Sequence, residues 1–92
     1  MIRSFADKRT EAAYSGKYDR SLPPDVNRIV ERKLKMIAAA TKLGDLNLPG
    51  NRLEKLKGAM DGLYSVRLND QWRVVFAWED GSAVQVRIVD YH

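Results

Sequence analysis

The hydrophobic period of this 92-residue chain changes once, from helical to strand-like, and this change constrains the fold more than any other feature. Apolar residues recur at helical spacing from Val26 to Ala40, whereas from about residue 52 onward they alternate with polar residues. The chain has no internal repeat, low-complexity segment or long linker. The pattern predicts a single α+β domain over residues 1–92, because a chain of this length can bury only one modest core.

The first half is predicted to contain a short strand and two helices. Met1–Phe5 alternates apolar with polar residues, and Asp7 is placed to cap a brief helix that runs to about Tyr14. A longer helix is expected to begin at the prolines of residues 23–24 and to end at Gly44. Its apolar stripe consists of Val26, Ile29, Val30, Leu34, Ile37 and Ala40. The opposite stripe, with Arg28, Arg32 and Lys35, is interpreted as a solvated helix face.

The second half is predicted to form an antiparallel meander of three strands. The runs 64–68, 72–78 and 84–88 have a period of two, with Val84, Val86 and Ile88 expected to point inward. Turn residues separate the runs at 69–70 and 80–81. We expect the helices to cover one face of this sheet. Trp72 and Trp78 share the inward face, so we interpret them as core residues and not as base-stacking platforms.

The register of the meander follows from the rule that apolar residues of neighbouring strands share a face. Three-residue loops at 69–71 and 79–81 would place Leu68 opposite Trp72 and Trp78 opposite Ser82. Arg67 would then lie opposite Arg73 on the face away from the helices. The same count predicts that Arg73 lies opposite Arg87.

Like charges that face each other destabilise a sheet pair, so this row of arginines needs an explanation. One interpretation is an anion site, since the planar guanidinium binds phosphate through two hydrogen bonds. The other is that carboxylates or water screen the arginines at little cost. The charge of the whole chain favours a polyanionic partner, with 16 Lys and Arg against 12 Asp and Glu.

Polar residues also gather at the end of the chain. By parity Tyr91 joins the arginine-bearing face, and the sole histidine, His92, follows it. A histidine can exchange protons near neutral pH, and Lys57 with Arg73 could stabilise charge on a phosphate. The alternative is that His92 is only a solvated chain end.

Several classes of chemistry find no support in the sequence. With one His and no Cys, no metal site is visible, and we expect no metal and no cofactor. The glycines do not match nucleotide-binding spacings, and no hydrolase triad can be assembled. No apolar stretch is long enough for a signal sequence or a membrane span, so we expect a cytoplasmic protein without membrane contacts.

Three motifs lie at residues 48–58 (LPGNRLEKLKG), 64–73 (YSVRLNDQWR) and 89–92 (VDYH), and the chain opens with MIRSF. Together they resemble the HigB toxins, also called plasmid maintenance killer proteins, of the RelE/ParE superfamily. The resemblance covers essentially the whole chain. It implies a RelE-like fold, with two N-terminal helices packed on one face of a twisted antiparallel sheet and an active surface on the other.

The resemblance also implies an activity. Family members enter the ribosomal A site and cleave mRNA without a metal: the ribose 2′-hydroxyl attacks the adjacent phosphate and leaves a cyclic phosphate. The catalytic residues implied by the motifs are Arg73, Lys57, Asp90, Tyr91 and His92. The basic residues expected to bind RNA are Arg52, Lys55, Arg67 and Arg87.

This chain departs from the family at Glu54, where many members have His. The carboxylate could act as a base in catalysis, or it could simply pair with Lys55 or Arg52 on a solvated edge. Sequences of this kind resemble the milder, GraT-like branch of the family, so low toxicity is expected.

The resemblance implies partners: a HigA-like helix-turn-helix antitoxin, the ribosome and mRNA, with operator DNA contacted only through the antitoxin. Two rival functions stay open. A ParE-like protein of the same fold would inhibit DNA gyrase and cut nothing, and a non-cleaving module would dock the antitoxin or the ribosome.

Overall fold

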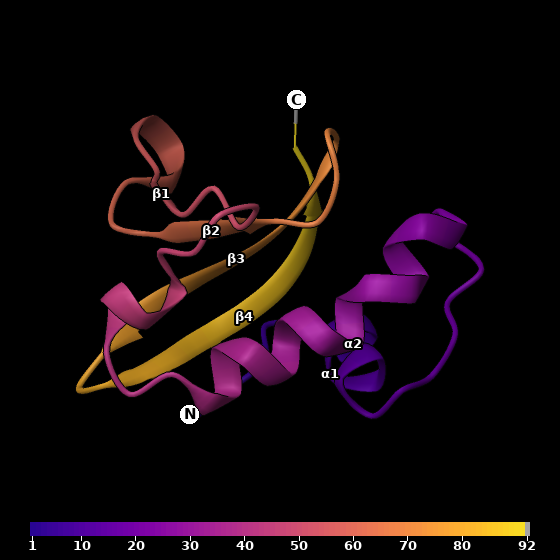
Figure 1. The fold of residues 1–92 in the computed structure, drawn as a ribbon, viewed down its shortest axis with the longest axis horizontal. Coiled ribbons are helices and arrows are strands. Elements are labelled where there is room, and N and C mark those ends of the chain that lie inside the picture. Colours follow the sequence, from indigo (N-terminus) through magenta and orange to yellow (C-terminus); the bar gives the residue numbers. More distant parts are fainter. Residues whose placement is uncertain (92) are drawn as a thin grey trace.

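The computed structural model describes residues 1–91, which form two α-helices, two short 3-10 helices and one four-stranded antiparallel sheet (Figure 1). The elements in chain order are α1 (Lys8–Tyr14), α2 (Pro24–Ala39), η1 (Leu43–Leu46), β1 (Glu54–Lys55), η2 (Gly58–Met60), β2 (Tyr64–Arg67), β3 (Trp72–Glu79) and β4 (Ser82–Asp90). The strands lie in the order β1-β2-β3-β4. The predicted α+β meander is confirmed, with the short edge strand β1 added to it.

Both predicted helices form, and their starts follow from local chemistry. The Asp7 side chain accepts a hydrogen bond from the Thr10 N–H at 2.8 Å and so caps α1. Helix α2 has proline at its first position, where the missing N–H has no helical partner to lose. The opening segment differs from the prediction: instead of a continuous strand it makes two isolated parallel bridges to β4, at Ile2 and Phe5.

Helix α2 ends at Ala39, earlier than the glycine at residue 44 predicts. The reason is a competing set of hydrogen bonds. The Asp45 carboxylate accepts from the N–H groups of Thr41 and Lys42, which starts η1 in place of another helical turn. The carbonyl of Ala40 instead accepts from the chain's amino terminus at 2.9 Å.

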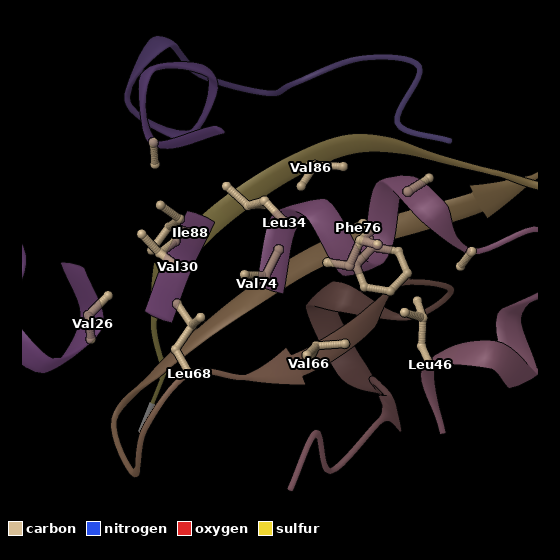
Figure 2. Close-up of a cluster of buried hydrophobic side chains, with 14 of the residues drawn as sticks. Val26, Val30, Leu34, Leu46, Val66, Leu68, Val74, Phe76, Val86 and Ile88 are labelled. Carbon is tan, nitrogen blue, oxygen red and sulfur yellow. The ribbon is translucent and has the colours of Figure 1, made fainter. Parts of the chain in front are cut away.

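The hydrophobic core lies between the helices and one face of the sheet (Figure 2). Its fully buried side chains include Phe76 of β3 and Leu34 of α2. Trp72 and Trp78 pack against this cluster, which confirms their interpretation as core residues. Val84, expected inward, lies outside the cluster and Ala83 takes its place, because β4 contains an irregularity after Val84.

Within residues 1–91, no helix combines the length and the apolar character that a membrane crossing requires.

Candidate active site on the arginine face

The sheet face opposite the helices is here called the arginine face, and it carries Arg67, Arg73 and Arg87. Arg67 pairs with Arg73 in the antiparallel register of β2 and β3, as predicted. The second predicted pair is wrong: Arg73 lies opposite Val89, and Arg87 lies opposite Val75. Arg87 is therefore a diagonal neighbour of Arg73, and the three arginines form a staggered group on one face.

Two irregularities cause this difference. The β3–β4 turn has two residues, Asp80 (φ +51°) and Gly81 (φ +78°), so Glu79 pairs with Ser82. A bulge then inserts one more residue into β4 near Gln85, whose φ is +54°. Each irregularity shifts the pairing by one residue. Together they shift it by two residues, so Arg73 pairs with Val89 in place of Arg87, while Arg87 stays on the same face of the sheet.

Arg73 is held by several contacts although it lies on the face away from the core. It is only 8% exposed. Its Nη1 lies 3.1 Å from the Glu54 carboxylate, and its Nη2 donates to the carbonyl of Arg52 at 2.5 Å. Its Nε is buried and has no hydrogen-bond partner among the described residues. The guanidinium is thus fixed in place while one of its donors stays unused.

Glu54 pairs with Arg73, and not with Lys55 or Arg52 as one interpretation of the sequence had it. It lies in β1, opposite Ser65 of β2, while Arg73 lies in β3. The ion pair therefore reaches across the intervening strand. Half of the Glu54 side chain is exposed, so the carboxylate is also accessible from solvent.

The other arginines are less constrained. Arg67 forms an ion pair with Asp70 at 2.5 Å, in which the aspartate side chain is almost fully exposed. Exposed pairs of this kind contribute little to stability, about 0–1 kcal/mol. Carboxylates thus partner both Arg67 and Arg73, as the screening interpretation requires, but only the Arg73 side chain is largely removed from water.

The C-terminal motif reaches the same site. The ring of Tyr91 lies beside Arg73, with 5.6 Å between the guanidinium carbon and the ring centroid. The Tyr91 N–H donates to the Gln71 carbonyl at 2.6 Å, and the Gln71 amide donates to both carboxylate oxygens of Asp90 at 3.1 Å. Gln71 therefore ties residues 90–91 to the β2–β3 loop. His92 lies outside the described residues.

The predicted lysines stand apart from this cluster. Lys55 and Lys57 are exposed, and within residues 1–91 neither joins the contacts around Arg73. Arg52 contributes its backbone carbonyl, while Arg87 is half-buried on β4. The structure therefore brings Glu54 and Tyr91 to Arg73, with the lysines at the periphery. Asp90 lies opposite Trp72, on the other face of the sheet, and is linked to the site through Gln71.

Sequence reasoning missed two residues of this site, Gln71 and Ser65. Ser65 is fully buried opposite both Glu54 and Val75, and its hydroxyl has no partner in the part of the chain that the structure describes. The alternation of β2 was sufficient to place Ser65 on the face of Arg67. Nothing in the sequence indicated that Gln71 acts as a tether, because loop residues carry no periodicity.

The fold assigns the protein to a structural class, the proteins with a RelE-like fold. The structure matches a chain of the YoeB–YefM complex from Staphylococcus aureus with a TM-score of 0.62 and 21% identity, covering 100% of this chain and 98% of that one. A chain of the Staphylococcus aureus YoeB dimer matches with a TM-score of 0.61 and 21% identity, covering 99% and 97%. These likenesses concern the fold, which is the RelE-like fold predicted from the sequence.

Sequence comparison then gives the family. The family model described as the RelE-like toxin of type II toxin-antitoxin system HigB matches residues 3–92. "Toxin HigB-1" of Vibrio cholerae serotype O1 is 40% identical over 86 residues, which cover 91% of this chain and 90% of that protein. "Endoribonuclease HigB" of Proteus vulgaris is 34% identical over 93 residues and covers both chains fully. The chain belongs to the HigB-like toxin family of type II toxin–antitoxin systems, which confirms the resemblance of its motifs.

Proposed function

We propose that this toxin is an endoribonuclease that cleaves mRNA in the ribosomal A site and so stops translation. The observation that carries the proposal is the pairing of Glu54 with Arg73 beside Tyr91 on the arginine face, because it places a proton acceptor next to a phosphate-binding cation. The name of the Proteus vulgaris relative, an endoribonuclease, supports the same activity.

The proposed reaction is an internal transfer of the phosphate. Glu54 accepts the proton of a ribose 2′-hydroxyl, whose oxygen then attacks the adjacent phosphorus. The guanidinium of Arg73 stabilises the negative charge that builds up on the phosphate oxygens. The bond from phosphorus to the 5′-oxygen breaks, and an acid from the Asp90–Tyr91–His92 motif protonates this leaving oxygen. The products are a 2′,3′-cyclic phosphate and a free 5′-hydroxyl, and no step calls for a metal or cofactor.

Arg73 is suited to this role because its position is fixed before substrate binds. A guanidinium held by Glu54 and by the Arg52 carbonyl loses little freedom when a phosphate arrives. The unused Nε is a donor that a phosphate oxygen can occupy if it displaces neighbouring groups. An incoming phosphate also competes with the Glu54 carboxylate for Arg73, which fits the low toxicity expected of this branch.

The remaining predicted residues are assigned to substrate binding. Arg52, Lys55, Arg67 and Arg87 would contact RNA phosphates, and Lys57 would assist Arg73 when the substrate brings them together. Affinity for the ribosome-bound message should fall as salt rises, since phosphate contacts release counterions. The whole site is assigned to one domain formed by residues 1–92.

The proposed partners follow from membership in a type II system. We propose that an antitoxin binds and neutralises this toxin; the structural neighbour from Staphylococcus aureus is likewise seen in a complex, of YoeB with YefM. We assign this role to a HigA-like helix-turn-helix protein, through which alone the toxin would reach operator DNA. Because the proposed substrate is mRNA on the ribosome, the proposed activity takes place in the cytoplasm.

The test is the mapping of mRNA 5′ ends after brief induction of the wild type and of Arg73→Ala without antitoxin. Arg28→Ala is the matched control, because it removes an exposed arginine from α2, on the opposite side of the sheet. We expect new ends within translated frames for the wild type and the control, and none for Arg73→Ala. The same RNA digested without ribosomes should stay intact. Growth inhibition without new ends would contradict the proposal and favour docking or gyrase inhibition.

A further inference from the structure

Helix α2 contains a buried lysine that the proposed reaction does not use. Lys33 is 7% exposed, and its ammonium donates to the side-chain carbonyl of Asn51 at 2.5 Å. No carboxylate lies within ion-pair distance of it in residues 1–91. Burial lowers the pKa of Lys33, and the nearby charges of Arg32 and Arg67 lower it further. A buried ammonium with only an amide partner is costly, so it calls for a reason.

The amide that receives Lys33 is itself completely buried and fully engaged. The Asn51 side-chain nitrogen lies 3.0 Å from the Leu46 carbonyl, to which it donates, and 3.2 Å from the sulfur of Met36. The backbone carbonyl of Asn51 accepts from the Arg67 N–H at 2.7 Å. Asn51 therefore connects α2 and η1 on one side to the strand of the arginine face on the other.

The residue after Asn51 contacts the site directly. Arg52 has a φ of +46°, a left-handed conformation that a non-glycine residue keeps only where its surroundings impose it. In this conformation its carbonyl accepts the hydrogen bond from Nη2 of Arg73. Lys33 thus holds the side chain of Asn51 on the core side, while the carbonyl of the next residue, Arg52, accepts from Arg73 on the other side.

We propose that Lys33 is a positioning residue for the active site: by holding Asn51, it fixes the Arg52 carbonyl that orients the guanidinium of Arg73. The catalytic consequence rests on the proposed function, whereas the positioning itself does not. Lys33 touches neither the arginine nor any reacting atom, and it acts only through the two intervening residues.

The cost of burying the charge of Lys33 opposes a purely stabilising role for this residue. Lys33→Met removes the desolvation penalty of a buried charge, which offsets the cost of leaving the buried Asn51 carbonyl without a donor. Lys33→Met keeps most of the packing volume but removes the donor to Asn51. The fold should therefore survive this change while the Arg52 carbonyl loses its support.

The test compares Lys33→Met with Lys35→Met, which makes the same change at an exposed position of the same helix. The first readout is the NMR signal of the Arg73 Nε–H group in the ¹⁵N-labelled chain. We expect this signal to shift or broaden in Lys33→Met and to stay unchanged in Lys35→Met. Lys33→Gln, which keeps a donor without the charge, should return the signal toward its wild-type position.

The second readout is cleavage by the ribosome-bound toxin. For Lys33→Met we expect the maximal rate to fall about tenfold to a hundredfold, with the half-saturating ribosome concentration changed less than about twofold. Lys33→Gln should recover most of the rate. A loss of ribosome affinity with an unchanged maximal rate would contradict positioning.

Three further results would overturn the proposal. The first is an Arg73 signal in folded Lys33→Met identical to that of the wild type. The second is an equal loss of the maximal cleavage rate in Lys33→Met and Lys33→Gln. The third is a melting temperature of Lys33→Met more than about 10 °C below wild type, which would make Lys33 a residue of the fold. A wild type that cleaves nothing would refute the proposed function instead, and the NMR comparison would still decide the positioning.

Discussion

The carboxylate of Glu54 and the guanidinium of Arg73 lie 3.1 Å apart although β2 runs between their strands. Ser65 occupies the intervening position on β2, opposite Glu54. Its small side chain leaves room for the two longer ones to meet above it. The candidate catalytic pair therefore depends on sheet order as well as on its own residue types.

Glu54→Gln separates the two functions that its carboxylate could have. If Glu54 is the base, the single-turnover cleavage rate should fall by about 10²–10⁴-fold, because an amide cannot accept the proton. The measurement is single-turnover cleavage on programmed ribosomes, with Glu31→Gln on the exposed face of α2 as control. A faster Glu54→Gln enzyme would show instead that the carboxylate only neutralises Arg73.

Lys33 should make stability depend on alkaline pH. Because the pKa of Lys33 is lowered below 10.5 in the folded chain, the unfolded chain binds more protons between the folded pKa and 10.5. The free energy of unfolding of the wild type, relative to Lys33→Met, should therefore rise with pH through this window and be lowest below it. Urea unfolding at a series of alkaline pH values measures this difference. If the free energies of unfolding of the two proteins changed with pH in parallel, Lys33 would not be the source of a pH dependence.

Gly81→Ala should destabilise the β3–β4 hairpin by about 1 kcal/mol, because its φ of +78° is unfavourable for any residue with a Cβ. The added Cβ would also lie 3.4 Å from the Thr41 carbonyl. Gly44→Ala is the matched control, since that glycine has no positive φ and open space around it. In urea unfolding, the free energy of unfolding of Gly44→Ala should equal or exceed that of the wild type. Equal effects of the two changes would contradict the turn geometry.

Leu34→Ala should lower the free energy of unfolding by about 2–5 kcal/mol, because it leaves a cavity where a completely buried side chain packed. Leu48→Ala makes the same change at a side chain that is 46% exposed and should alter stability by less than about 0.5 kcal/mol. Thermal and chemical unfolding of both variants measures the difference. A small effect at Leu34 would show that the core in Figure 2 relaxes around the gap.

Much of the fold was predictable because its signals are local or periodic. Helical spacing predicted α2, and a capping aspartate predicted the start of α1. Alternation predicted the face of the strand residues except at the start of β4, where Ala83 and not Val84 points inward. The pairing of Arg67 with Arg73 followed from a three-residue loop that the structure confirms. The pairing of Arg73 with Arg87 did not hold, because turn length and a bulge decide it.

That bulge is a product of tertiary contacts. The N–H of Gln85 donates to the hydroxyl of Ser4, and the next N–H of β4 donates to the Ser4 carbonyl, at 2.9 and 3.1 Å. A segment at the other end of the chain thus supplies partners for the backbone where β4 is irregular. Periodicity within β4 carries no information about such a partner.

The sequence by itself determined the two helices, the meander, the face on which each arginine lies and the family, because periodicity and motifs are properties of the chain alone. Only the tertiary structure decided which residues meet: Glu54 with Arg73, and Lys33 with Asn51. Alternation selects the face of a side chain but not its partner on another strand. Partners depend on how turns, bulges and long-range hydrogen bonds set the register once the chain is packed.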